Sequence, residues 1–148
     1  MSGPMDDRGE TLLEVLIAVV IMGIAIVAII GGLVTSVMLS DVHRKQATAG
    51  SAVRDYAETI EQYVAANTYV ACQSAANYTS LVAFTKPNGY TPWVSRVQYW
   101  NGSGWVTTCG TDSGLQQLTV QVSSNDKRAT EQLVIVVRKP CGLADSPC

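Results

Sequence analysis

An unbroken run of uncharged residues, from Val15 to Ser40, constrains this chain more than any other feature. As a helix with a rise of ~1.5 Å per residue, the run would be roughly 39 Å long, more than the ~30 Å hydrocarbon core of a bilayer. A helix that is apolar all round must lie in lipid or among other apolar helices. We therefore expect this part of the chain to spend part of its life in a membrane.

A short polar junction, Arg8-Gly9-Glu10-Thr11-Leu12-Leu13-Glu14, leads into the run. An ionisable side chain at the edge of an apolar span is functional by default, so we expect Glu14 to have a specific role. Thr11 and Glu14 also have the spacing of a capping box, with Thr11 at the N-cap and Glu14 at the third helical position. The two interpretations are compatible, because capping involves only the local backbone.

The junction resembles the processing site of type IV pilins and of the pseudopilins of type II secretion. Their precursors carry a short leader ending in Gly, then a Thr-Leu-apolar-Glu stretch with Glu as the fifth mature residue, and then a long apolar helix. The resemblance implies cleavage between Gly9 and Glu10, methylation of the new amino terminus at Glu10, and a role for Glu14 in assembly. The first mature residue is usually Phe or Met, whereas here it is Glu10.

The resemblance also implies how the chain is divided. Residues 1–9 would be the leader, residues 10–40 a transmembrane and filament-core helix, and residues 41–148 an extracytoplasmic pilin-like domain. The implied partners are a prepilin peptidase, other pilin subunits, the pilus assembly platform and, before assembly, the cytoplasmic membrane. The chain would then move to a filament at the cell surface or in the envelope. Many major pilins have a Pro in the apolar helix. This chain has Gly31-Gly32 in the corresponding region, and Gly is a weaker helix breaker than Pro. We expect these two glycines to be a weak point of the helix.

Two alternatives compete with this interpretation of the N-terminal region. A secretory signal peptide has a basic start and a shorter apolar run, and this chain has Asp6 and Asp7 at its start. The positive-inside rule would place Arg44 and Lys45 in the cytoplasm. The cysteines and the processing junction favour the opposite orientation, which we adopt.

Four cysteines follow the apolar run, at Cys72, Cys109, Cys141 and Cys148. With no Cys-x-x-Cys pair and a single histidine, His43, a zinc site is not expected. An even number of cysteines in a small extracytoplasmic domain indicates two disulfides, and four cysteines allow three connectivities. The sequence alone does not choose among them. We favour Cys72–Cys109 with Cys141–Cys148, the second closing a C-terminal loop as in pilins.

One long helix is predicted from Thr11 to about Asn67, followed by a loop over residues 73–92. The second half of the helix is amphipathic, with a single apolar stripe at helical spacing. We call this set the stripe: Val53, Tyr56, Ala57, Ile60, Tyr63 and Val64.

The rest of the chain predicts four strands in two successive hairpins: Trp93–Trp100, Trp105–Cys109, Leu115–Ser123 and Thr130–Arg138. Asn101-Gly102 is a turn signal between the first two. Leu133 to Val137 is apolar without interruption, which favours a strand covered on both faces. We expect a four-stranded antiparallel meander whose apolar face is covered by the stripe, an α+β fold.

The remaining side-chain groups indicate binding less clearly. Aromatic residues of the first hairpin (Trp93, Tyr99, Trp100 and Trp105) are expected to form core and cross-strand pairs, with a sugar-binding or adhesive face as the alternative. His43, Arg44 and Lys45 are expected to form a solvated collar beside the apolar run, with contacts to lipid headgroups or an acidic neighbour as the alternative. Lys86, Arg96, Lys127 and Arg128 are too scattered for a DNA groove, and the net charge of −2 also disfavours nucleic acid as a partner, although DNA uptake is known in the family.

No pattern in the sequence indicates catalysis. A Gly-x-Ser-x-Gly elbow, a phosphate-binding loop and a pair of positioned carboxylates are all missing, so we expect no enzyme activity, no cofactor and no metal. The interpretation is a structural subunit, a minor pilin of a type IV pilus-like filament. The alternatives are a pseudopilin of a type II secretion-like machine and a single-pass membrane protein whose outer domain binds a ligand without polymerising.

Overall fold

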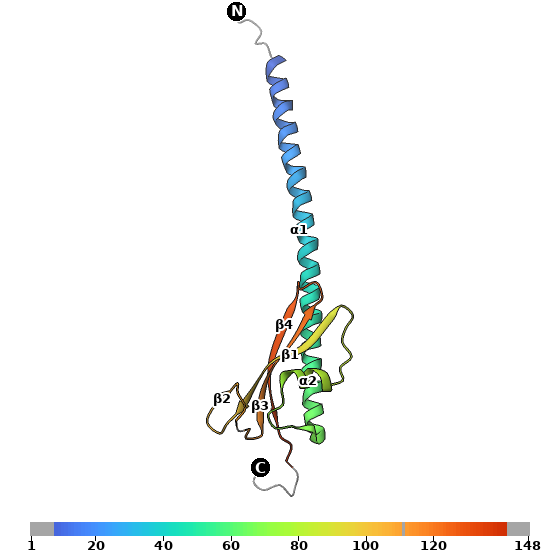
Figure 1. The fold of residues 1–148 in the computed structure, drawn as a ribbon. Coiled ribbons are helices and arrows are strands. Elements are labelled where there is room, and N and C mark those ends of the chain that lie inside the picture. The colour runs from blue at the N-terminus through green and yellow to red at the C-terminus, as the bar shows by residue number, and fades with distance from the viewer. Residues whose placement is uncertain (1–7, 111, 142–148) are drawn as a thin grey trace, which may run out of the picture. The chain divides into compact units, whose positions relative to one another are not determined.

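The computed structural model describes residues 8–110 and 112–141 (Figure 1). By its internal contacts the chain divides into two compact units, residues 1–41 and 42–148. A single long helix, α1 (Arg8–Tyr63), contributes its first part to one unit and its last part to the other.

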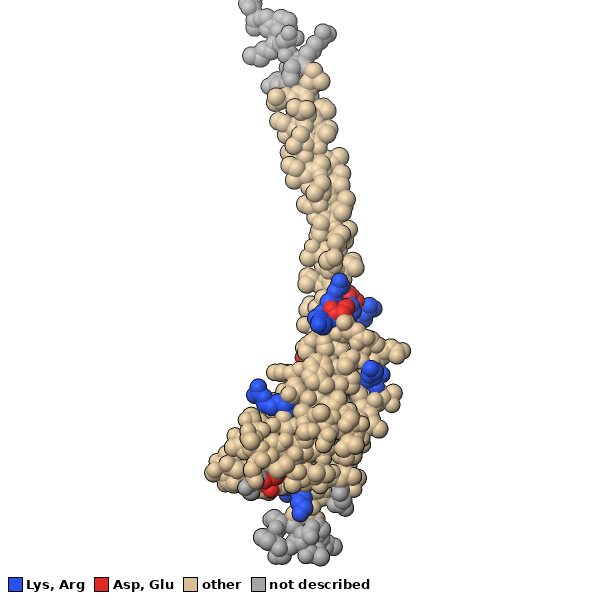
Figure 2. Space-filling view, viewed as in Figure 1, with Lys and Arg blue, Asp and Glu red and all other residues tan. Residues whose placement is uncertain are grey.

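The first unit is the apolar part of α1. Every residue from Leu12 to Ser40 is exposed, and the large apolar side chains among them have exposed fractions between 50% and 74%. An 18-residue window of this helix has a mean hydropathy of 3.0 and no buried residues, which makes it long and apolar enough to cross a membrane. No charged side chain is seen on the face of this segment shown in Figure 2. The segment therefore requires a cover that the described part of the chain does not supply.

The second unit is a sheet with helices on one face. After α1 come a π-helical turn η1 (Val64–Thr68) and a short helix α2 (Ala75–Leu81). Four strands follow, β1 (Tyr90–Trp100), β2 (Trp105–Val106), β3 (Leu115–Ser124) and β4 (Thr130–Arg138). All neighbouring strands are antiparallel. The expected α+β fold, a long helix with a four-stranded antiparallel sheet, is confirmed.

The order of the strands differs from the expected meander. It is β2-β1-β3-β4, so β1 pairs directly with β3 and the short β2 lies at the edge. Only two residues of the expected return strand, Trp105 and Val106, pair with β1. So short a strand cannot form the central ladder of a sheet, whereas β3 pairs with β1 over nearly its whole length.

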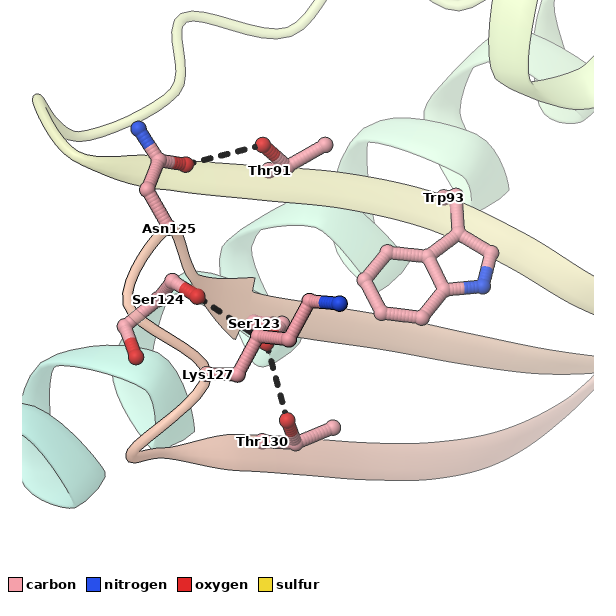
Figure 3. A pocket seen from close by; sticks show the side chains of 7 residues that line it. All are labelled: Thr91, Trp93, Ser123, Ser124, Asn125, Lys127 and Thr130. Carbon is pink, nitrogen blue, oxygen red and sulfur yellow. Dashed lines mark hydrogen bonds between the residues drawn. The ribbon is translucent and has the colours of Figure 1, made fainter.

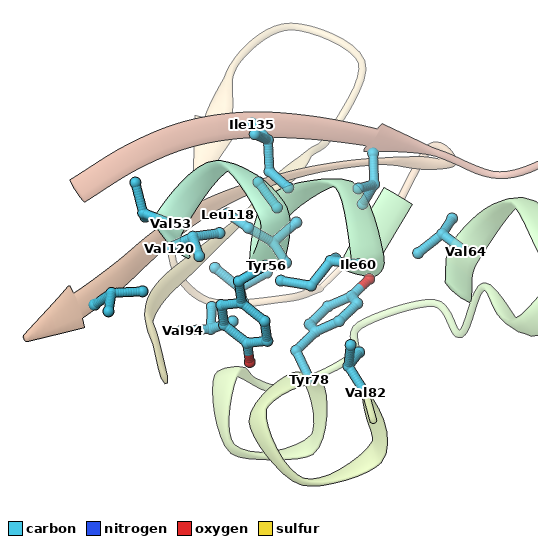
Figure 4. Close-up of a cluster of buried hydrophobic side chains, with 14 of the residues drawn as sticks. Val53, Tyr56, Ile60, Val64, Tyr78, Val82, Val94, Leu118, Val120 and Ile135 are labelled. Carbon is cyan, nitrogen blue, oxygen red and sulfur yellow. The ribbon is translucent and has the colours of Figure 1, made fainter. Parts of the chain in front are cut away.

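The stripe on α1 forms the centre of the core, as expected (Figure 4). Tyr56 and Ile60 are almost completely buried, at 1% and 0% exposed. They pack against the inner side of the sheet, which includes the fully buried Leu118, Val120 and Val122 of β3. Burying each such side chain contributes about 1.5–3 kcal/mol relative to leaving it in water.

The helix α2 was not expected within residues 73–92. Ser74 is its N-cap, and the hydroxyl oxygen of Ser74 accepts a hydrogen bond from the backbone N–H of Asn77 at 3.2 Å. Asn is unfavourable in the interior of a helix, but Asn77 lies in the first turn, where its N–H needs such a partner. The helix places Tyr78 in the core, fully buried.

The strand β4 is not covered on both faces. Its side chains alternate, with Ile135 and Val137 buried while Val134 and Val136 are 52% and 48% exposed. The reason is that β4 is an edge strand and that helix packing is confined to one face of the sheet.

We predict that Ile60→Ala lowers the free energy of unfolding of the globular unit by about 2–5 kcal/mol, because it leaves a cavity between α1 and the sheet. The matched control is Val134→Ala, at an exposed position of β4, with an expected change below about 0.5 kcal/mol. Urea unfolding followed by tryptophan fluorescence measures both. Equal effects of the two variants would contradict the described core.

Candidate functional site

The residues of the processing junction lie in the first turns of α1. Gly9 and Glu10 directly follow Arg8, the first residue of the helix, and Glu14 lies about one turn beyond Glu10. The side chain of Glu14 is exposed and is followed at once by the exposed apolar segment. A carboxylate is thus held at the edge of a surface that must be removed from water.

The expected capping box is not formed. Because α1 begins at Arg8, Thr11 is inside the helix and does not occupy the N-cap. Arg and Glu favour helix, and a single Gly costs only about 1 kcal/mol, so the helix extends through Gly9. Glu14 therefore has no capping role in the described chain, and assembly is the role that stays predicted for it.

The apolar helix runs without interruption through Gly31 and Gly32. A Cβ atom added at either glycine would have no heavy atom within 4 Å, so the described chain does not require glycine there. The hydroxyl group of Thr35 donates to the carbonyl oxygen of Gly31 at 3.0 Å. That a weak point in the helix lies here stays a prediction.

The comparison with protein families decides what the junction is. Residues 4–30 match the family model described as the prokaryotic N-terminal methylation motif. The chain carries the prepilin signal of type IV pilins and pseudopilins. No curated protein and no solved structure matches the chain.

A prepilin signal defines a class of precursor. It supports a pilin-like or pseudopilin precursor, processed by a prepilin peptidase and assembled with other pilin subunits. The apolar helix that follows fits membrane anchoring before assembly. The motif and the fold are those of a structural protein.

A second polar arrangement lies at the far end of the α1 stripe, around a disulfide. Cys72 is joined to Cys109, with a distance of 5.6 Å between their Cα atoms, which is the pairing that we favoured. The other expected pairing, Cys141–Cys148, involves a residue outside the described part of the chain. The sulfur atoms of Cys72 and Cys109 lie close to Asp112, but disulfide sulfur is not a thiolate ligand, so this group is not a metal site.

Asp112 ties the disulfide region to the sheet through four hydrogen bonds. Its carboxylate accepts from the hydroxyl of Tyr69 at 2.6 Å and from the backbone N–H of Gly114 at 2.8 Å. It also accepts from the N–H of Cys72 at 2.9 Å and the amide of Gln116 at 2.7 Å. Gln116, on the inner side of β3, is fully buried.

The same contacts set the protonation states of Asp112 and Tyr69. Burial by itself raises the pKa of the Asp112 carboxyl, but the hydrogen bonds to its ionised form outweigh burial, and the pKa lies below its ordinary value. Burial raises the pKa of the Tyr69 hydroxyl, and the neighbouring Asp112 raises it further. Tyr69 therefore stays a neutral donor and Asp112 a charged acceptor.

Lys45, in the expected collar, lies against an acidic residue of the globular unit. The ammonium of Lys45 lies 2.5 Å from a carboxylate oxygen of Asp126, in the turn between β3 and β4. Tyr90 donates to the carbonyl oxygen of Lys45 at 3.4 Å. The hydrogen bond from Lys45 is the main reason why the pKa of Asp126 lies below its ordinary value. Lys45 was expected to be solvated, with an acidic neighbour as one alternative, and the structure shows the acidic neighbour, in the turn after β3.

The aromatic residues of the first hairpin do not form one cluster. Tyr99 is buried, and its hydroxyl donates to the carbonyl oxygen of Gln73 at 2.9 Å. Trp100 and Trp105 form an edge-on pair across the strands, with 5.3 Å between ring centroids. Trp93 lines a groove on the other side of the sheet from α1. Core and cross-strand roles therefore hold for three of the four residues.

We predict that Asp112→Asn lowers the free energy of unfolding by about 1–3 kcal/mol at pH 7, because Asn cannot accept all four hydrogen bonds. A carboxyl whose pKa is lowered by folding stabilises the protein above its unfolded pKa of about 3.9, and this contribution is lost as the pH falls further. The difference between wild type and variant should therefore shrink below about pH 4.

Urea unfolding at pH 7 and at pH 3, with the disulfide intact, provides this measurement. The control is Asp55→Asn, on the exposed surface of α1, which should leave stability nearly unchanged. A difference between wild type and Asp112→Asn that is the same at both pH values would rule out the ionised carboxylate as the cause.

Proposed function

We propose that this chain is the precursor of a structural subunit, a minor pilin, of a type IV pilus-like filament. A prepilin peptidase cuts between Gly9 and Glu10, the new amino terminus is methylated, and residues 10–40 pack among the helices of other subunits. Residues 41–148 form the extracytoplasmic domain. One observation carries the proposal: the prepilin signal leads directly into an apolar helix that has no cover in the described chain.

Assembly replaces the lipid around the apolar helix with the helices of other subunits. Exposed apolar side chains between Leu12 and Leu39 are in contact with lipid before assembly and with other helices afterwards. Since lipid and helix interiors are similarly apolar, close packing and polar pairing must drive the exchange. Gly31 and Gly32 present bare backbone, which allows a neighbouring helix to approach closely.

Glu14 supplies the polar pairing. Cleavage creates a cationic amino group at Glu10, at the edge of the apolar helix, and methylation keeps it cationic. A carboxylate of Glu14 on a neighbouring subunit pairs with it where few other polar groups are present, although desolvation of both charges opposes the pairing. The side chain of Glu10 adds a negative charge at the same place, so the pairing is weaker than it would be with an apolar first residue.

Two other functions remain as outcomes of the experiments. Pseudopilins of type II secretion carry the same signal, and the filament that contains the chain distinguishes them from pilins. A single-pass anchor that never polymerises would keep the chain in the membrane fraction. N-terminal sequencing tests the permanent-anchor alternative, because a mature chain that begins at Glu10 is not a simple permanent anchor.

We predict that Gly9→Val blocks leader removal, because the peptidase must accommodate a small residue at the scissile bond and a β-branched side chain obstructs it. Intact-mass measurement should show the leader of residues 1–9 retained in the variant and absent from the wild type. Gly23→Val is the matched control, since a side chain there has open space and the variant should be processed normally. Equal removal of the leader from wild type and Gly9→Val would contradict the assigned cleavage site.

We predict that Glu14→Ala leaves leader cleavage, disulfide formation and membrane insertion intact but reduces the filament fraction. A loss of about 1.4 kcal/mol in the pairing would reduce incorporation roughly tenfold. Sheared filaments and membranes are compared by immunoblot in cells without other copies of the chain. Glu58→Ala, at an exposed position of α1 outside the apolar segment, is the control and should assemble normally. Full incorporation of Glu14→Ala would leave Glu14 without an assembly role.

A further inference from the structure

The side of the sheet that faces away from α1, which we call the outer face, is covered by no described element. Strand β3 presents alternating side chains, with Gln116, Leu118, Val120 and Val122 buried against the helix. The residues between them, Gln117, Thr119, Gln121 and Ser123, therefore point to the outer face. These are amide and hydroxyl side chains, and they form a polar, uncharged centre of this face.

A groove of about 520 Å³ lies on the outer face next to the turn between β3 and β4 (Figure 3). The indole of Trp93 forms one side, and the ammonium of Lys127 is turned toward it from the other side. The hydroxyl groups of Ser123 and Thr130 lie 2.9 Å apart within the groove. An aromatic surface, hydroxyl groups and a cation are thus brought together from β1, β3, β4 and the turn.

Lys127 occupies a backbone conformation that is unfavourable for a lysine. Its φ angle is +58°, in the left-handed region that glycine or asparagine adopts more readily. Within the described residues, the ammonium of Lys127 makes no ion pair, since Asp126 in the same turn pairs with Lys45 and Arg128. A cation is therefore held beside Trp93 at some backbone strain and without a carboxylate partner from the described chain.

The charges on the outer face have one sign. Arg96 lies opposite Thr119, and Arg138 lies opposite Leu115, so both arginines share this face. None of the outward-pointing strand residues that the structure describes is acidic, because Glu131 lies opposite the buried Val122 on the inner side. The face is therefore complementary to an anionic ligand.

A second aromatic surface lies along the same strand. Trp100 is paired with Trp105 and follows the buried Tyr99, so it points to the outer face. Trp93 points to the same face because it lies opposite Gln121, and the register shift between Val94 and Arg96 changes the alternation along β1. Trp100 is seven positions after Trp93 on β1, but the register shift takes up one of them, so the two lie about 20 Å apart at ~3.3 Å per residue. Two aromatic platforms with polar groups between them fit a linear ligand with several units.

We propose that the outer face binds a linear acidic polysaccharide. The apolar faces of sugar rings stack on Trp93 and Trp100, the Ser, Thr and Gln side chains bond the sugar hydroxyls, and Lys127 and Arg96 pair with uronate carboxylates. A single-stranded nucleic acid fits less well, because it carries a charge on every nucleotide whereas the cations of this face are few. The proposal does not depend on filament assembly.

The test uses the full chain in detergent micelles and three probes of similar length: an alginate hexasaccharide, the neutral cellohexaose and a dT6 oligonucleotide. Titration calorimetry should give a dissociation constant below about 1 mM for alginate, with weaker binding of the other two. Trp93→Ala and Lys127→Gly should each weaken alginate binding roughly tenfold, a change of about 1.4 kcal/mol. Lys127→Gly suits the left-handed backbone at this position, so we expect the variant to stay folded.

The matched control is Arg54→Gln, which removes an exposed cation from α1 rather than from the outer face and should leave binding unchanged. Binding of alginate no tighter than that of cellohexaose, or binding unaffected by Trp93→Ala and Lys127→Gly, would overturn the proposal. Tighter binding of dT6 through the same residues would replace the polysaccharide with a nucleic acid. Leader cleavage and filament formation are measured separately, so none of these results bears on the proposed function.

Discussion

The packing of the α1 stripe against the inner side of the sheet is the interaction on which the globular unit depends. Tyr56 and Ile60 are the largest fully buried side chains of α1, and β3 contributes three fully buried apolar side chains to the same contact. Because strand side chains alternate, this contact also decides what the other side of the sheet presents. The polar outer face and the exposed Val134 and Val136 are both consequences of it. One hydrophobic contact thus separates a core from a surface available for binding.

The first part of the same helix, unlike the stripe, needs a cover from outside the described chain. Its apolar side chains have no cover from the described chain, and leaving them in water costs about 25 cal/mol for each Å². Lipid and other helices both satisfy this requirement, and a prepilin signal belongs to chains that use first one and then the other. We therefore propose that the polar residues at the start of α1 matter more for when the helix leaves the bilayer than for how the domain folds.

The sequence predicted those features that depend on local periodicity or on a linear motif. The stripe, the limits of β4 and the signal around Gly9 and Glu14 belong to this class. The strand order could not be predicted from the sequence. It depends on the length of β2, which is set by how the residues after Val106 pair, and no local sequence pattern indicates that pairing. The hydrogen-bond partners of Asp112 could not be predicted either, because the four donors come from residues 2 to 43 positions away in the sequence. The groove was missed for the same reason, as a single aromatic residue in a strand predicts core packing.

The ion pair between Lys45 and Asp126 has a mechanical consequence. Lys45 lies only a few residues inside the globular unit, and Asp126 belongs to the turn that joins β3 and β4. A pulling force that enters the unit along α1 is therefore shared at once between the helix backbone and this turn. Beyond that point, the force acts parallel to the long contact between the stripe and the sheet, so that many side chains must slide together before any separate.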